Sequence, residues 1–581
     1  MKKYLFLLII IGFISCSDLF DKTNLESIGS DIVYNDPALL ASYVNNLYAT
    51  YPTWTRQEND LSDEGRNGYR RHDAWLIITG EWGLDNNPMG YWAYDYVRKC
   101  NEILFNIDDA PLDESLKNRI KGEVLFLRAT AYFNMFKRYG GLPIITEPQT
   151  FDSEDIYPER SSIDETLDFI TKEYDQAATL LQDYKTYDNS DFGRVTWGAC
   201  KAMEARAYLF WASPLYNSST DDSRWRKSAE LSNEVIESGL YELISDPRNL
   251  FVDKESPENI FAIYFKMPER YHGVDAWCKP LSIANGDAAH WGPLQEFVDA
   301  FPTINGLSIV DDPMYDPSNP YTNRDPRLHA FVCVNESQYA GRTQYNYWSL
   351  GNVDPSFPKN EADRFRTYQV GGEFQDSPST AHNSITGYIN RKMVDESLPK
   401  NAYSGGWGST TPYIEIRLGE VILNYAEALN ELGEIDKSVI ELEKIRKRAG
   451  ILNPAVPQAD KVSKESLRKF IQNERYIELS FEHKRYWDLR RWKLAESKLG
   501  GKQFSGMKIY LNLLENSEVL SSDAYKNASF EEQLDMLNKT WTYEPYYVDE
   551  EPYVFDKKMY FMPIPLSDME TNPNLIQNEG W

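Results

Sequence analysis

Apolar residues recur every three to four positions over long stretches of this 581-residue chain, which is the spacing of one face of an α-helix. The first such stretch begins at Asp36-Pro37, an N-cap residue followed by a proline at the first helical position, and continues through Leu40, Val44 and Leu47. Similar patterns predict helices over residues 92–107, 115–139, 161–184, 196–216, 225–238, 416–432, 436–449 and 464–499. The chain is therefore expected to be mainly α-helical.

Two of the predicted helix pairs have the dimensions of a helical repeat. The pair over 416–449 spans 34 residues, which is the period of a tetratricopeptide repeat. The pair over 196–239 carries small residues at Ala199, Ala202 and Ala205, where two helices can approach closely. Because each pair buries its apolar face against its neighbours, we expect a scaffold of stacked helix pairs. The scaffold helices lie at about 36–50, 92–239 and 413–499.

The pattern changes at about 52–91 and at about 243–412. Short strand-like runs such as 260–265 are separated there by Gly-, Pro-, Asn- and Ser-rich stretches with clusters of aromatic residues. Long irregular segments inside a compact protein usually carry function. No low-complexity linker separates these segments from the helices, so residues 16–581 are expected to form a single domain.

The N-terminus has the features of an export signal. Lys2 and Lys3 precede a run of ten mostly apolar residues, which is too short for a bilayer that needs about 20. Cys16 follows small and apolar residues and resembles the lipidated cysteine of bacterial lipoprotein signals; an ordinary secretory signal is the alternative. We expect residues 1–15 to be removed and Cys16 to carry two or three acyl chains, which together hold a protein at a membrane.

The charge of the chain disfavours two classes of partner. The formal net charge is −28, and it becomes −30 when Lys2 and Lys3 leave with the signal. Nucleic acid needs a basic patch for its phosphates, and anionic lipid headgroups also attract basic segments. Beyond residue 15 no stretch reaches 18 apolar residues, so no transmembrane helix is expected.

No pattern of metal-binding or nucleophilic residues stands out. The cysteines are widely spaced, and the six histidines form no HExxH motif. Cys100 and Cys200 fall in helical apolar patterns, so we expect them to be buried. We predict no cofactor apart from the lipid, and the loop at Asp311-Asp312 is the one place where we consider a structural calcium ion.

Seven segments carry distinctive motifs. They are 122–143 (GEVLFLRATAYFNMFKRYGGLP), 193–208, 323–328 (NRDPRL), 386–392, 417–428, 474–492 (ending in RYWDLRRW) and 562–578. Together and in this order they resemble the signature segments of the SusD/RagB-like nutrient-binding outer-membrane lipoproteins of Bacteroidetes. The resemblance extends from about residue 90 to residue 581.

The resemblance implies a SusD-like fold, with a scaffold of tetratricopeptide type and a loop-rich half that has a few short strands and carries the ligand site. It implies a non-catalytic protein that binds oligosaccharides or polysaccharides and delivers them to a SusC-like TonB-dependent outer-membrane barrel. Lipid on Cys16 would anchor the protein in the outer membrane. Asp18 and Asp21 resemble the signal that sends such lipoproteins to the cell exterior.

Sugar binding needs flat aromatic rings beside polar side chains, because the C–H face of a pyranose lies on a ring while its hydroxyls form hydrogen bonds. Three loop stretches combine these residue types. The candidate ligand residues are Trp75, Trp82, Asp85, Asn86 and Trp92 in the first stretch, Trp277, Asn285 and Trp291 in the second, and Tyr347 and Trp348 in the third. For each single tryptophan, burial in the core or in a partner interface is the alternative. As a group, at least one is expected to line the site.

The charged residues between 474 and 491 alternate with aromatic residues on a predicted helix. We interpret them as an ion-pair network inside the scaffold, and the alternative is a surface for the partner. Three other functions also stay open. A receptor for peptides would use the same scaffold, a glycoside hydrolase would need two carboxylates roughly 5–10 Å apart, and a pure helical-repeat scaffold would have no exposed aromatic site.

Overall fold

The computed structural model of this chain describes residues 30–581, except for 55–57, 68–72, 151, 154, 281–290, 345, 347–383, 400–407, 453, 512–521, 529–531, 533–534 and 537–539. The signal segment with Cys16 therefore lies outside the described residues, as do Asn285, Tyr347 and Trp348. Helices make up most of the regular structure and the strands are short, so the predicted fold class is confirmed.

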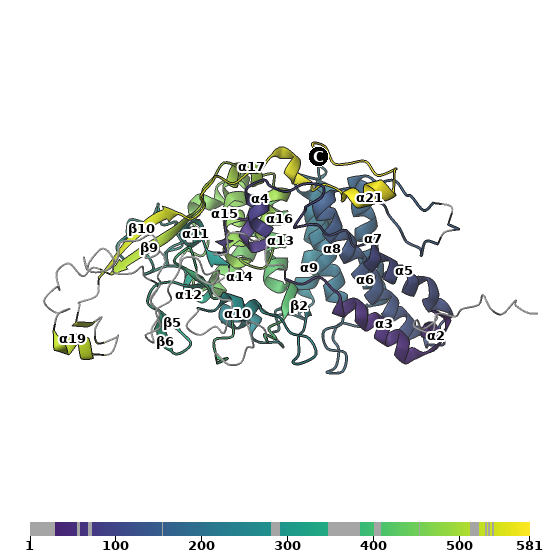
Figure 1. Ribbon diagram of the computed structural model, residues 1–581, viewed down its shortest axis with the longest axis horizontal. Helices are drawn as coiled ribbons and strands as arrows, with labels where there is room; N and C mark the ends of the chain where they lie inside the picture. Colours follow the sequence, from purple (N-terminus) through teal and green to yellow (C-terminus); the bar gives the residue numbers. More distant parts are fainter. Residues whose placement is uncertain are drawn as a thin grey trace, which may run out of the picture.

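Long helices form a scaffold in which successive helices pack on one another (Figure 1). They are α3 (Pro37–Ala49), α5 (Tyr94–Asn106), α6 (Glu114–Tyr139), α7 (Ile163–Leu180), α8 (Trp197–Ala212), α9 (Asp222–Glu237), α13 (Leu418–Glu431), α14 (Ile435–Arg448), α15 (Lys464–Glu478) and α16 (Arg485–Arg491). α7 packs against both α6 and α8, and α13 joins the two halves of the scaffold by packing against α9 and α15. The helix pairs predicted at 196–239 and 416–449 are both present.

Polar side chains determine where several scaffold helices begin. The carboxylate of Asp36 accepts hydrogen bonds from the backbone N–H groups of Ala38 and Leu39 at the start of α3. Ser162 and Glu165 form a reciprocal capping box at the start of α7. These are the helix starts that the sequence predicts.

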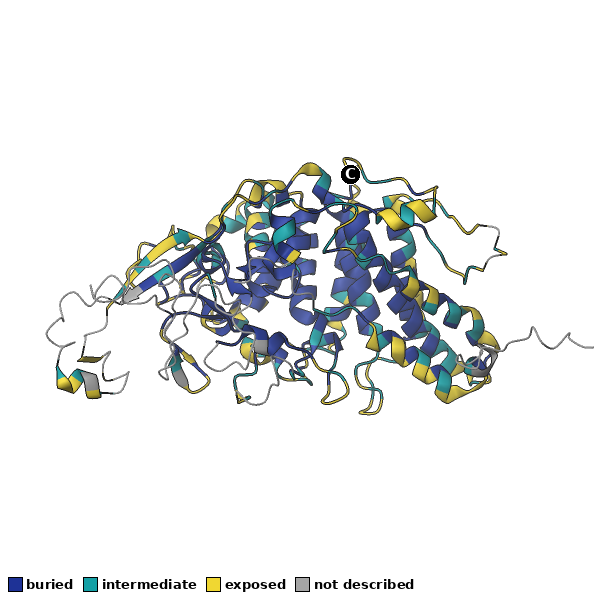
Figure 2. Ribbon diagram, viewed as in Figure 1, coloured by how far each residue is buried: buried dark blue, intermediate teal, exposed yellow. Residues whose placement is uncertain are grey.

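Helix α6 packs against α5 and α7 and is buried on almost every side from Gly122 to Tyr139 (Figure 2). A helix that is enclosed all round needs apolar or small residues on every face, as this segment has. Gly122 is required by close packing, because a Cβ atom there would lie 2.6 Å from Cγ of Leu181. The motif segment at 122–143 is thus largely a core element.

The loop-rich half lies beside the scaffold and has its own apolar core, which includes Phe297, Phe301 and Phe331. Its short helices are α10 (Val274–Cys278), α11 (Gln295–Ala300) and α12 (Pro326–Phe331). The antiparallel strand pairs are β1 (Gly65–Arg66) with β3 (Gly292–Pro293), β2 (Asn259–Ile263) with β8 (Tyr413–Arg417), β4 (Val332–Cys333) with β7 (Ile389–Asn390), β5 (Ser337–Tyr339) with β6 (Arg342–Gln344), and β9 (Ser505–Leu511) with β10 (Trp541–Tyr547). The remaining short elements are α2 (Ser30–Asn35), η2 (Glu58–Leu61), α4 (Asp73–Ile78), η3 (Ile107–Asp109), η4 (Pro247–Phe251), η7 (Gln458–Lys461), α17 (Ala495–Lys498), α19 (Asp523–Asn527), η8 (Lys557–Tyr560) and α21 (Leu566–Thr571).

The β2–β8 pair joins the two halves. Phe261 of β2 packs edge-on against Phe126 of α6, with ring centroids 5.0 Å apart, and against Tyr51 at 5.7 Å. β8 leads directly into α13. Residues on this pair are therefore fixed relative to both the scaffold and the loops.

Residues 554–581 run back across the scaffold as a covering segment (Figure 1). The N–H of Met562 donates to the carbonyl oxygen of Arg138 at 2.7 Å. The ring of Trp581 lies 4.6 Å from that of Trp82. This covering segment closes the surface over helices formed much earlier in the chain.

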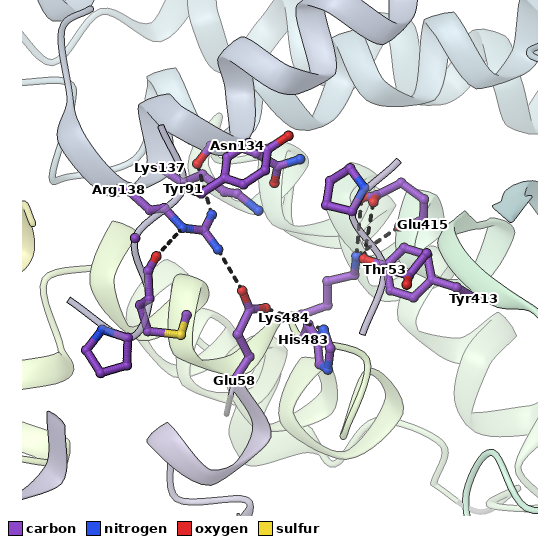
Figure 3. Close-up of a pocket in the computed structure, with 14 residues that line it drawn as sticks. Thr53, Glu58, Tyr91, Asn134, Lys137, Arg138, Tyr413, Glu415, His483 and Lys484 are labelled. Carbon is purple, nitrogen blue, oxygen red and sulfur yellow. Dashed lines mark hydrogen bonds and ion pairs between the residues drawn. The ribbon is translucent and has the colours of Figure 1, made fainter. Parts of the chain in front are cut away.

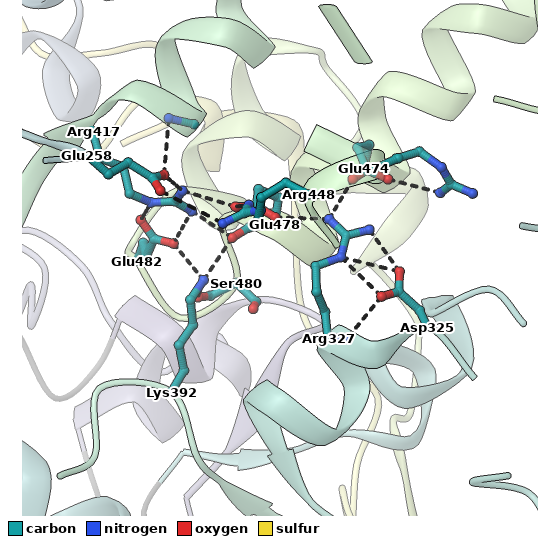
Figure 4. A network of polar contacts seen from close by, with 12 residues as sticks. Glu258, Asp325, Arg327, Lys392, Arg417, Arg448, Glu474, Glu478, Ser480 and Glu482 are labelled. Atoms are coloured by element: carbon teal, nitrogen blue, oxygen red, sulfur yellow. Dashed lines mark hydrogen bonds and ion pairs between the residues drawn. The ribbon is translucent and has the colours of Figure 1, made fainter. Parts of the chain in front are cut away.

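Charged residues on α15 and the turn after it form a buried ion network (Figure 4). The guanidinium of Arg417 bonds to Glu482 at 2.7 Å, to Glu258 at 2.6 Å and to Glu478 at 3.0 Å. Burial alone would raise the pKa of Glu478, but the surrounding arginines lower it below its ordinary value. The charges are inside the molecule, so the interpretation as a scaffold network is confirmed.

Among the described residues, no helix has the length and hydropathy that a membrane crossing requires. Cys100 and Cys200 are buried, as predicted, and neither forms a disulfide. At the loop considered for calcium, Asp312 accepts hydrogen bonds from Thr303 and Asn305. No trio of His, Cys, Asp or Glu within the described ranges is placed to hold a metal ion.

Candidate functional site

A polar pocket, called here the central pocket, opens between the scaffold and the loop-rich half (Figure 3). Its empty volume is about 630 Å³, including the solvent at its mouth. The lining residues come from the chain around residues 52–58, the loop before α5, helix α6, strand β8 and the turn between α15 and α16. They are Pro52, Thr53, Glu58, Pro88, Met89, Gly90, Tyr91, Asn134, Lys137, Arg138, Tyr413, Glu415, His483 and Lys484.

The turn between α15 and α16 places His483 and Lys484 at the pocket. Phe481 and His483 both adopt φ near +59°, a left-handed conformation that a non-glycine residue rarely occupies. The buried ring of Phe481 and the ion network on Glu482 hold this turn in place. Backbone strain of this kind persists only where the surrounding structure fixes the conformation.

The two carboxylates of the central pocket are paired with cations. Arg138 bonds to Glu58 at 3.0 Å. Nδ1 of His483 lies 3.5 Å from the same carboxylate, but burial lowers the pKa of His483 to about 4, so its ring is neutral at pH 7. Burial would raise the pKa of Glu58, but His483 when protonated, together with Arg138, lowers it. The pKa of Glu415 is lowered in the same way, against burial, by Lys484 and other cations.

These pKa directions bear on catalysis. A glycoside hydrolase needs one carboxylic acid whose pKa is raised so that it can protonate the leaving group. Glu58 and Glu415 both have lowered pKa values and stay ionised. Neither carboxylate therefore matches the protonated acid of this chemistry.

Two groups on α6 face the pocket with donors to spare. Asn134 and Lys137 are one turn apart, so both side chains point the same way (Figure 3). Burial lowers the pKa of Lys137 to about 7, and within the described ranges no carboxylate lies at ion-pair distance from its ammonium. Nor does the side-chain amide of Asn134 form a hydrogen bond within these ranges. A bound molecule with hydroxyl or carbonyl oxygens would satisfy both groups.

Beside the pocket lies an aromatic row, defined by Trp54, Phe265, His272 and Tyr413. The Trp54 ring lies 4.3 Å from His272, 5.7 Å from Phe265 and 5.3 Å from Tyr413. Trp54 and Tyr413 are half-buried, and Tyr413 also lines the central pocket. The arrangement joins aromatic faces to a cavity with free hydrogen-bond donors.

The structure divides the first predicted ligand stretch. Trp82 is buried against Trp581, whereas Asp85 and Asn86 are exposed on the loop that follows. Trp75 is half-buried on α4. None of these four lines the central pocket, but residues 88–91 of the same stretch do.

Trp92, Trp277 and Trp291 also do not line the central pocket. Trp92 is half-buried and packs edge-on against Tyr139 at 5.0 Å. Trp277 and Trp291 are in the core of the loop-rich half, with 6% and 1% of their surface exposed. The structure thus does not bring the candidate tryptophans that it describes, which are Trp75, Trp82, Trp92, Trp277 and Trp291, together around one pocket.

The sequence did not single out several residues of this site. Asn134 and Lys137 lie within the motif segment 122–143, which contains none of the ligand residues predicted from the sequence. His483 and Lys484 lie within another. One feature of the sequence could have indicated Lys137. It lies in a helix segment that is mostly apolar, and a lysine in such a segment is rarely buried without a special role.

Comparisons with known proteins show what this chain is similar to. The family model described as "SusD family" matches residues 257–581, more than half of the chain. A second model, described as "Starch-binding associating with outer membrane", matches residues 19–209. Together the two models span most of the scaffold and the loop-rich half.

Individual relatives are distant but cover most of the chain. SusD-like protein P2 of Formosa agariphila is 23% identical over 531 residues, covering 86% of this chain and 92% of that protein. A SusD-like protein of Bacteroides ovatus is 20% identical over 422 residues, covering 70% and 66%.

Solved structures show the same fold. A SusD-like protein from Bacteroides fragilis aligns with a TM-score of 0.73 and 25% identity, over 96% of this chain and all of that chain. A SusD-like carbohydrate-binding protein from the same species aligns with a TM-score of 0.72 and 23% identity, over 94% and 100%. A laminarin-binding SusD-like protein aligns with a TM-score of 0.62 and 18% identity, over 94% and 100%.

Proposed function

Because this chain belongs to the SusD family, we propose that it is a non-catalytic, lipid-anchored protein of the outer membrane that binds glycans and delivers them to a SusC-like TonB-dependent barrel. Members of this family are carbohydrate-binding proteins rather than enzymes, and two relatives in the structural comparison are described by their binding of carbohydrate and of laminarin. The family model for the N-terminal part refers to starch binding and to the outer membrane.

The observation that carries glycan binding is the aromatic row beside the central pocket. Trp54 and Tyr413 are aromatic residues that are only partly buried, and Asn134 and Lys137 offer hydrogen-bond donors in the pocket that Tyr413 also lines. An aromatic contact adds roughly 0.5–1.5 kcal/mol beyond burial, and each net hydrogen bond contributes about the same. After the costs of association, a few such contacts give millimolar to micromolar affinity, which suits a receptor that releases its ligand.

The first test is glycan binding by the full mature chain without its lipid. Calorimetry and tryptophan fluorescence against a panel of polysaccharides, mucin glycans and peptides would identify the ligand class. We expect Trp54→Ala to weaken binding of the recognised glycan about tenfold, because one aromatic face and its buried area are lost.

Trp211→Ala is the matched control. Trp211 is also half-buried, but it stacks on Tyr208 and Arg224 on the scaffold rather than on the aromatic row. Binding that survives Trp54→Ala unchanged would remove the row from the site. Saturable binding of peptides with none of glycans would replace glycan binding by the peptide-receptor alternative.

Anchoring and delivery need separate tests in the native membrane. We expect the unchanged chain to incorporate labelled palmitate and to be cleaved by protease added to intact cells, and Cys16→Ala to abolish the labelling. We expect a tagged chain to co-purify with a TonB-dependent barrel. Labelling that persists in Cys16→Ala would contradict the anchor, and purification without any barrel would contradict the delivery role.

A further inference from the structure

A second hollow, called here the side groove, lies where the end of α3, the loop at residues 190–194 and the end of β2 meet next to Arg270. Its empty volume is about 780 Å³, including open solvent. It shares no lining residue with the central pocket and contains none of the ligand residues that the sequence predicts. Arg270 connects it to the aromatic row, because its guanidinium lies 4.8 Å above the ring of Phe265.

One wall of the side groove is an aromatic platform. The ring of Phe192 is 47% exposed and its centroid lies 4.6 Å from that of Tyr264. The two rings approach because the next residue is Gly193, with φ of +91°, where a Cβ atom would lie 2.8 Å from Cδ2 of Tyr264. The chain thus holds a large apolar ring at the surface, where a ligand can cover it.

Facing this platform is an arginine with unused donors. A guanidinium has five N–H groups, and the hydrogen bond found for Arg270 is from Nη1 to the carbonyl oxygen of Tyr48 at 3.2 Å. Across the described ranges no carboxylate forms an ion pair with it. Arg194 in the same groove differs, because its guanidinium bonds to Glu123 and to Asn45, both at 2.9 Å.

We propose that the side groove binds a sugar ring that carries an anionic group, either a carboxylate or a sulfate ester. The apolar face of the ring lies on Phe192 and Tyr264, and the anionic group pairs with Arg270. This inference rests on the proposed glycan binding and specifies in addition that the bound sugar is anionic. A guanidinium suits this role because its planar donors match both carboxylate and sulfate oxygens.

The rest of the protein opposes an anionic ligand at long range, since the chain has a net charge of −28. Burial together with the nearby carboxylates of Asp253 and Glu255 raises the pKa of Tyr264 to about 12. Arg270 must therefore hold the anionic group by direct contact. Raising the salt concentration screens the long-range repulsion more than the contact pair, so added salt is expected to leave binding unchanged or to strengthen it slightly.

The test uses the full mature chain without its lipid and three tetrasaccharides: tetragalacturonate, a sulfated galactose tetramer and an uncharged galactose tetramer. We expect an acidic tetramer to bind about tenfold more tightly than the uncharged one. Arg270→Gln should remove that preference, because it should weaken binding of the acidic tetramer about tenfold and binding of the uncharged tetramer much less. Phe192→Ala should weaken binding of both kinds about threefold to tenfold.

Arg224→Gln is the matched control, because Arg224 also lies over an aromatic ring, that of Trp211 at 4.5 Å, but pairs with Asp164. If Arg270→Gln weakens the binding of only one acidic tetramer, the carboxylate or sulfate ester of that tetramer is the group that Arg270 binds. Equal binding of charged and uncharged tetramers would overturn the inference while glycan binding stands. Arg270-dependent binding of an acidic peptide, with no acidic sugar bound, would also overturn it. If none of these tetramers and none of the wider panel of polysaccharides and mucin glycans binds, the proposed function is removed instead.

Discussion

The buried ion network and the central pocket are made of the same residue types and lie on the same turn after α15, yet their charges are arranged differently. In the network, Arg417 contacts three carboxylates, and Lys392 donates to Glu482 at 2.6 Å. In the pocket, Lys137 has no such partner within the described ranges. Charges that satisfy one another stabilise a fold, whereas a donor that stays unmatched beside a cavity is available to a ligand.

The largest expected effect is the loss of a network member. Arg417→Ala leaves Glu258, Glu478 and Glu482 buried without their shared cation, so we expect the free energy of unfolding to fall by about 3–5 kcal/mol. Urea denaturation followed by circular dichroism measures this. Arg98→Ala is the control, because Arg98 pairs with Glu102 at the surface and its loss should cost about 0.5 kcal/mol or less. Equal losses in both variants would show that the network is no more than a set of surface-like pairs.

In the central pocket, removal of a charged side chain is expected to raise the free energy of unfolding instead of lowering it. Folding lowers the pKa of Lys137 from 10.5 to about 7, so between these values the unfolded chain binds more protons and stability rises with pH. Below pH 7 the lysine is charged in both states and its burial penalty is complete. We therefore expect Lys137→Met to stabilise the protein by about 1–2 kcal/mol at pH 6, with the gain shrinking toward pH 10.

Urea denaturation at pH 6, 8 and 10 measures this gain. The control is Lys172→Met, which removes an exposed lysine on α7 that pairs with Asp168. A gain from Lys137→Met that is independent of pH would indicate better apolar packing rather than relief of a buried charge.

Replacement of Asn134, an uncharged hydrogen-bond donor, is expected to have a smaller effect. Asn134→Leu removes an amide that has no described partner, so we expect little change in stability and a loss of about fivefold in affinity for the recognised glycan. Asn118→Leu, on the same helix but outside the pocket, is the matched control. Isothermal titration calorimetry measures the glycan affinity of both variants. An unchanged affinity in Asn134→Leu would move the ligand away from α6 toward the aromatic row alone.

Much of the scaffold was predictable from the sequence, because helix starts are local. Asp36 and the Ser162–Glu165 box mark their helices by chemistry within three residues, and the predicted helix over 115–139 is present as α6, Glu114–Tyr139. The helical spacing of apolar residues also distinguishes the scaffold segments from the loop-rich segments of the sequence. These signals do not depend on contacts with distant parts of the chain.

The site was less predictable, because its contacts are long-range. Trp82 combines an aromatic ring with nearby Asp and Asn as a sugar site would, but its ring packs against Trp581, which no local pattern could indicate. Lys137 belongs to a core helix, and the sequence does not say that a cavity opens beside it. The proposed roles of the candidate ligand residues, including Asp85 and Trp92, stay predictions.

The covering segment at residues 554–581 has a consequence for the order in which the protein matures. Helices α5 to α7 are synthesised long before the segment that closes over them. The carbonyl oxygen of Arg138 accepts its hydrogen bond from the N–H of Met562, which comes more than 400 residues later in the chain. During that interval the ring of Trp82 lacks its cover. This face of the helices can therefore close only after the last residues of the chain have been made.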